Sequence, residues 1–93
     1  MPARDDEQRW LARAHEAIAG GDIEGALSWI DRHAQSFPAS ALAPERVVLR
    51  VDALCRAGRR GDAEAAIAAW RAGGSSALPR IAARLDARLA AGC

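Results

Sequence analysis

The chain has 93 residues, a mass of 9.8 kDa and 24 alanines, which is typical of one small domain built from closely packed helices. One Phe, three Trp and no Tyr argue against a β-sandwich, which needs more aromatic residues. The net charge of +1 excludes a strongly basic nucleic-acid binder, and no apolar run approaches the length needed to span a bilayer.

Two helices are predicted in the first half of the chain. Apolar residues recur at helical spacing over residues 10–18, and the glycines at 20–21 end that segment. Asp22 is a natural N-cap for a second helix, whose apolar stripe runs through residues 23–30. We expect this second helix to end before Pro38.

Three further helices are predicted in the second half, where no strand pattern is present. The third helix closes at Gly58, and Asp62 should cap a fourth helix that ends at residues 73–74. The fifth is expected to start near Ser76, with Pro79 in its first turn. The fold class is therefore predicted to be all-α, with about five helices.

The predicted helices repeat along the chain. Residues 21–27 match residues 61–67 at a separation of 40 positions. The segments 29–38 and 70–79 each begin with Trp and end with Pro. Because a helical hairpin cannot bury both of its apolar faces alone, we expect each hairpin to stack on its copy.

Each unit also places large, small and terminating residues at characteristic positions. In the first unit these are Trp10, Ala14, Ala26, Ile30 and Pro38. In the second unit, with Arg59-Arg60 counted as an insertion, they are Val48, Val51, Cys55, Ala66, Trp70 and Pro79. The chain therefore resembles a pair of tetratricopeptide-type repeats, although Arg13 and His33 stand where Leu and Ala are usual in that family.

This resemblance implies an architecture and a kind of function. Residues 37–43 are similar to the junctions of bacterial cell-envelope repeat proteins of the Tol–Pal and outer-membrane-assembly type. The implied fold is a single domain over residues 1–93, a short right-handed α-solenoid of two antiparallel hairpins, about 7–38 and 41–79, with a capping helix at about 79–91. Repeats of this kind are scaffolds for protein–protein interaction.

The sequence carries no recognisable catalytic or metal motif. The glycine-rich turn at 73–76 lacks the Lys of a phosphate-binding loop. His15 and His33 fall on different predicted helices without a third metal ligand, and we interpret them as surface or groove residues. Cys55 and Cys93 have no redox-motif spacing, so a structural Cys55 with an incidental Cys93, a disulfide formed in an oxidising compartment, and a reactive thiol all stay open. We expect a non-enzyme without cofactor or metal.

If the hairpins stack as the resemblance implies, the first helix of each unit lines a concave groove. The predicted groove residues are Gln8, Leu11, His15 and Ile18 from the first unit, and Arg46, Leu49, Ala53 and Arg56 from the second. Leu11, Ile18 and Leu49 would then be exposed apolar side chains, which mark an interface. Apolar anchors flanked by Arg suit a peptide or an amphipathic helix with some acidic character, unless the fifth helix or a second copy covers them.

Charge is distributed unevenly along the chain. Residues 1–45 hold four Arg and eight acidic residues, whereas residues 46–93 hold nine Arg and four acidic residues. Arg80, Arg84 and Arg88 form a basic face on the last predicted helix. That face is a solvated surface, a surface for an acidic partner, or one half of a head-to-tail contact between copies.

Three functions follow from these observations. The leading prediction is a scaffold that binds a peptide or helix of a partner protein in the groove. The alternative is a structural, self-assembling module whose groove is buried in a homo-oligomer, and a third possibility is a regulator that contacts an anionic ligand through the basic face. No nucleic-acid partner and no direct membrane insertion are expected. Without a signal peptide the chain is expected in the cytoplasm, or in the periplasm if it is a domain excised from an envelope protein.

Overall fold

Five α-helices make up the described part of the chain, which is residues 4–73 and 78–93 of the computed structural model. In chain order they are α1 (Arg4–Ala19), α2 (Ile23–Ser36), α3 (Ala43–Arg56), α4 (Arg60–Ala72) and α5 (Pro79–Ala90). These residues contain no strand, so the all-α prediction with about five helices is confirmed. The predicted helix start at Ser76 lies outside the described residues.

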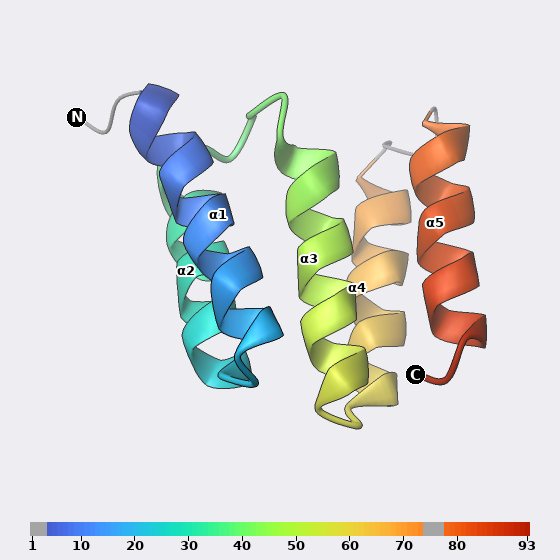
Figure 1. The fold of residues 1–93 in the computed structure, drawn as a ribbon. Coiled ribbons are helices and arrows are strands. Elements are labelled where there is room, and N and C mark those ends of the chain that lie inside the picture. The colour runs from blue at the N-terminus through green and yellow to red at the C-terminus, as the bar shows by residue number, and fades with distance from the viewer. Residues whose placement is uncertain (1–3, 74–77) are drawn as a thin grey trace.

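The helices lie in two layers. In Figure 1, α1, α3 and α5 run in the same direction in the front layer, and α2 and α4 run the opposite way behind them. α1 packs against α2, α3 packs against α4, and α3 also contacts both α2 and α5. The structure measures 37 × 31 × 17 Å, and its shortest dimension fits two layers of helices.

Both hairpins turn through the same glycine-ended motif. Gly21 and Gly58 have φ angles of 82° and 73°, in the left-handed region that glycine adopts without steric cost. The residue after each glycine, Asp22 or Arg59, donates its backbone N–H to the carbonyl oxygen five residues earlier, at 2.8 Å in both hairpins. α1 and α3 therefore end in the same way.

The start of α2 confirms one predicted helix cap. The Asp22 carboxylate accepts a hydrogen bond from the backbone N–H of Gly25 at 3.0 Å. A Cβ atom at Gly25 would overlap that carboxylate. The glycine is therefore what allows the Asp22 side chain to fold back over the end of the helix.

The start of α4 corrects a second prediction. Asp62 does not cap this helix, because α4 already begins at Arg60. The left-handed residue that ends α3 is Gly58, so Arg59 directly precedes α4, and residues 60–62 add nearly one turn to its start. Asp62 lies in that turn and accepts a hydrogen bond from Arg59 Nε at 2.8 Å. Of the two residues counted as an insertion, Arg60 is thus the first residue of α4, and Arg59 is the residue before it.

The core has two parts. The larger cluster joins α3, α4 and α5, and its buried members are Val47, Val51, Leu54, Cys55, Ala63, Ile67 and Leu85. A smaller cluster of Ile18, Ala26 and Ala53 joins the first hairpin to α3, and its alanines let the helices approach closely. Within the described ranges, no helix is long and apolar enough to cross a membrane.

Candidate partner-binding groove

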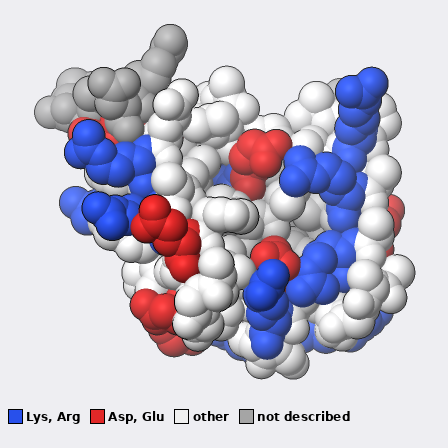
Figure 2. All heavy atoms as spheres, in the orientation of Figure 1, with Lys and Arg blue, Asp and Glu red and all other residues white. Residues whose placement is uncertain are grey.

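A groove opens on the face formed by α1, α3 and α5. Its volume is about 590 Å³. The lining residues are His15 from α1, Glu45, Val48, Leu49 and Asp52 from α3, and Arg84, Leu85, Ala87, Arg88 and Ala91 from the α5 side. Figure 2 shows this face with its central hollow, and basic side chains gather over α5 along one edge.

α3 forms the floor of the groove. Glu45, Val48, Leu49 and Asp52 follow one another at i, i+3, i+4 and i+7, which places them on one face of the helix. Val48 and Leu49 are half-buried, so part of their apolar surface stays accessible. The floor is therefore an apolar strip with a carboxylate at each end.

Two arginines connect the α5 wall to this floor. Arg84 Nη1 donates to Glu45 Oε1 at 3.2 Å, and Arg88 Nε donates to Asp52 Oδ1 at 2.8 Å. Arg56 reaches the same aspartate from α3 itself, with Nε 3.2 Å from Asp52 Oδ2. Both carboxylates of the floor are thus paired with the basic wall.

Positive charge exceeds negative charge at this wall. Arg80 is exposed and forms no ion pair with any residue that the structure describes. Together with the three paired arginines it makes four guanidinium groups, which meet only two carboxylates. The predicted basic face is therefore partly neutralised by α3 but keeps a surplus of positive charge.

The predicted groove residues divide into two groups. His15 and Leu49 line the groove. Leu11 and Ile18 are only 8% and 3% exposed, so the prediction of exposed apolar side chains is wrong for both. Ile18 packs against the buried alanines of α2 and α3 and does not line the groove.

The other predicted positions lie outside the groove lining. Gln8 is exposed near the start of α1, and Ala53 is fully buried between helices. Arg56 is exposed and touches the groove only through Asp52. Arg46 is half-buried and points into a polar network elsewhere, so its placement in the groove is wrong.

That polar network surrounds His33. The side chain of His33 is fully buried, so its interpretation as a surface or groove residue is wrong. Its Nε2 lies 3.0 Å from Glu7 Oε1, and its Nδ1 lies 3.0 Å from Arg46 Nη1. The same Arg46 nitrogen donates to the carbonyl oxygen of Phe37 at 3.1 Å. The His33 network, made of Glu7, His33 and Arg46, therefore links α1, α2 and α3.

The geometry assigns a neutral imidazole to His33. A guanidinium group can only donate, so Nδ1 accepts from Arg46, and the proton lies on Nε2, which donates to Glu7. Burial disfavours the charged ring and lowers the pKa of His33, Arg46 lowers it further, and the Glu7 carboxylate opposes only part of this effect. The network holds three helices together through a histidine that stays uncharged.

The burial of His33 had a signal in the sequence. Ala26, Ile30 and His33 lie at i, i+4 and i+7, so the histidine continues the apolar stripe of α2. Its partners come from 26 residues earlier and 13 residues later in the chain. The pattern on α2 therefore indicates that His33 is buried, but it does not indicate which residues form hydrogen bonds with its imidazole ring.

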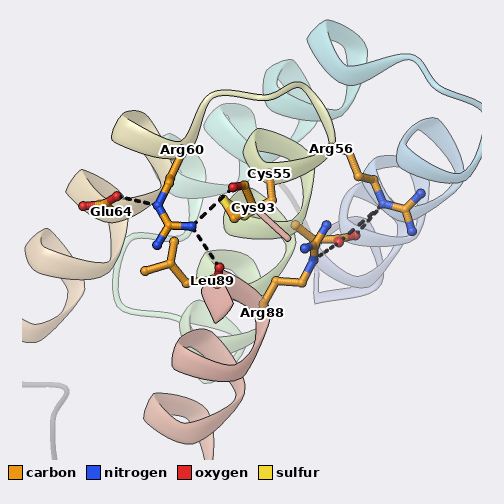
Figure 3. The surroundings of a disulfide bond; sticks show 8 residues. Cys55, Arg56, Arg60, Glu64, Arg88, Leu89 and Cys93 are labelled. Atoms are coloured by element: carbon orange, nitrogen blue, oxygen red, sulfur yellow. Dashed lines mark hydrogen bonds and ion pairs between the residues drawn. A yellow bond between two sulfur atoms is a disulfide. The ribbon is translucent and has the colours of Figure 1, made fainter. Parts of the chain in front are cut away.

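A disulfide links the end of the chain to α3. Cys55 and Cys93 are bonded, which decides among the alternatives that their spacing left open. Next to the bond, Arg60 Nη1 donates to the carbonyl oxygens of Leu89 and Cys93 at 3.2 and 3.3 Å (Figure 3). The covalent bond and these hydrogen bonds meet at the end of α5, which carries the basic wall of the groove.

Comparison with known proteins gives no relative for this chain. No family model, no curated protein and no solved structure matches it. The resemblance to tetratricopeptide repeats and to envelope proteins therefore stays a prediction that depends on the sequence pattern alone.

Proposed function

We propose that this protein is a non-enzymatic protein-interaction module, and that its groove binds an amphipathic helix of a partner protein. The observation that carries the proposal is the apolar floor of Val48 and Leu49, which stays partly accessible between charged walls. An apolar centre within a polar rim is the usual composition of a protein interface. The resemblance to tetratricopeptide repeats supports the same function.

The charges around the floor define the chemistry of the partner. The arginines that pair with α3 carboxylates are already satisfied, so the surplus positive charge is free to act on an incoming chain. A helix with an apolar stripe for Val48 and Leu49, and with Asp or Glu along the edge that faces α5, complements both features. A strongly basic helix is disfavoured by the same surplus.

The test is a selection from displayed helical peptides of about four turns, against the oxidised protein. We expect the selected peptides to combine an apolar stripe with an acidic edge. Leu49→Asp should raise their Kd by about 30-fold or more, because it places a charge in the centre of the interface. Circular dichroism of this variant checks that the helices are retained.

The matched control is Leu78→Asp. Leu78 directly precedes α5, is 42% exposed and does not line the groove, so its replacement should leave the Kd unchanged. Selected peptides that bind Leu49→Asp as tightly as the wild type would contradict the proposal. If light scattering instead finds a dimer that Leu49→Asp dissociates, and no peptide is selected, the groove belongs to a homo-oligomer.

A further inference from the structure

α5 is the helix on which the shape of the groove depends most. It supplies both arginines that line the groove, Arg84 and Arg88, and four of the ten lining residues. Only Leu85 of this helix is fully buried, at 1% exposed, in the cluster with α3 and α4. At 12 residues, α5 is also near the length at which an isolated helix is marginal in water. Its position therefore depends on what connects it to its neighbours.

Several of the noncovalent connections of α5 are exposed, whereas the Arg88–Asp52 ion pair is partly buried. Ile81 and Leu89 also pack, partly buried, against the larger core cluster. Arg71 donates to Asp86 at 2.8 Å and Arg84 donates to Glu45 at 3.2 Å, in both cases between side chains that are about half exposed. Water and salt screen such pairs, so each contributes little. Arg60, which binds the carbonyl oxygens at the end of the helix, is itself 52% exposed.

One further connection is covalent. Cys93 lies three residues beyond the end of α5 and is bonded to Cys55, next to the last residue of α3. Cys55 is 5% exposed, whereas Cys93 is only partly buried, so Cys93 is the more accessible of the two residues. The bond spans 38 positions and closes a loop that contains both α4 and α5.

We propose that the Cys55–Cys93 disulfide is a redox control on the groove, which holds the basic wall in place when oxidised and releases α5 when reduced. The inference rests on the proposed function, because it concerns the regulation of the same groove. In the reduced chain α5 keeps the buried Leu85, the partly buried Ile81 and Leu89, and its ion pairs. α1, α2 and α3 keep the His33 network, which contains no sulfur.

The chemical step is thiol–disulfide exchange with a dithiol. A thiolate of the dithiol attacks the Cys93 sulfur, the bond between the two cysteines breaks, and Cys55 leaves as a thiolate that takes up a proton. The second thiol of the reductant then displaces Cys93 from the mixed disulfide. Two electrons and two protons pass to the protein, which gains two thiols, and the dithiol becomes a disulfide.

Hydrogen–deuterium exchange measured by mass spectrometry tests the release of α5 without any ligand. After reduction with dithiothreitol, the α5 amides should exchange about tenfold faster or more, while those of α1, α2 and α3 stay protected. Cys93→Ser should reproduce this pattern in the absence of reductant. Unchanged protection of α5 would overturn the proposal, and so would loss of protection in all helices, since the bond would then stabilise the whole fold.

Arg60→Gln is the matched control for the end of α5. This variant keeps the disulfide but loses the hydrogen bonds to the carbonyl oxygens of Leu89 and Cys93. In the oxidised form it should keep α5 protected. If Arg60→Gln exposes α5 as much as reduction does, the hydrogen bonds and not the disulfide hold the helix, and the proposal is wrong.

A second readout connects the release to the groove. The methyl resonances of Val48 and Leu49 should shift on reduction, because both side chains line the groove with α5, and this holds whether or not any peptide binds. A selected helical peptide should bind the reduced chain about tenfold more weakly or worse. Equal affinity in both states, or unshifted methyl resonances, would overturn the redox control. A failure to select any peptide would count against the proposed function alone.

Discussion

The two ends of the molecule are connected to α3 by different chemistry. At the N-terminal end, the His33 network joins α1 and α2 to α3 through buried hydrogen bonds. At the C-terminal end, a disulfide, an exposed ion pair and a part-buried ion pair join α5 to α3. The first connection depends on protonation and the second on the redox state. The central helix α3 is thus supported on its two sides by contacts that respond to unrelated conditions.

Removal of the imidazole should break the N-terminal connection with the largest effect. His33→Ala leaves Glu7 and Arg46 without their shared partner and opens a cavity at a fully buried position. We expect the free energy of unfolding to fall by about 3 kcal/mol. Urea denaturation of the oxidised protein measures this change.

The exposed histidine of α1 provides the control. His15→Ala removes the same side chain from the wall of the groove and should change the free energy of unfolding by about 0.5 kcal/mol or less. If His15→Ala and His33→Ala lower the free energy of unfolding by similar amounts, the buried network is not what holds the first hairpin to α3.

Acidification should weaken the same connection while leaving the disulfide intact. The pKa of His33 lies below its ordinary value of 6.5 in the folded state, so the unfolded chain takes up the proton first. The stability present above pH 6.5 is therefore lost as the pH falls below that value towards the folded pKa. The urea midpoint of the wild type should fall more between about pH 7.5 and about pH 5.5 than that of His33→Ala. Parallel pH profiles would contradict this expectation.

The two matching Gly-Asp pairs, one before α2 and one in the first turn of α4, give the smallest predicted difference and extend the comparison to the helix starts. Asp22→Ala removes a side-chain cap of α2 and should lower the free energy of unfolding by about 1 kcal/mol. Asp62→Ala removes only an exposed pair with Arg59 and should cost no more than about 0.5 kcal/mol. Thermal or urea unfolding of both variants provides the measurement. Equal losses of unfolding free energy would mean that the two aspartates contribute equally.

The helices were predictable because each carries a local signal. Apolar spacing located all five, and the glycines at 21 and 58 ended α1 and α3 as expected. The start of α4 was not predictable from the repeat, because the Gly-Asp match drew attention to Gly61, whereas the left-handed turn is at Gly58. The sequence match shows that the same residue types recur. It does not show which glycine adopts the left-handed conformation that ends the helix.

The candidate site was less predictable because it depends on contacts between distant residues. His15 and Leu49 line the groove as expected, but Leu11 and Ile18 are buried. Ile18 is buried by packing against alanines of α2 and α3, and the alanine of α3 lies far from it in the chain. The pairing of Cys55 with Cys93 could not be decided either, because spacing alone does not bring two cysteines together.

The uneven charge of the chain allows ion pairs to form between its acidic and basic halves. Glu24 of the first hairpin lies 3.5 Å from Arg59 of the second, and Asp31 lies 2.7 Å from Arg50. If a second copy of the first hairpin replaced the second hairpin, Asp22 would occupy the place of Arg59, and Glu24 would meet a carboxylate. The charges of the two halves thus favour the observed order of the hairpins over an exchanged one, by the small amount that exposed ion pairs contribute.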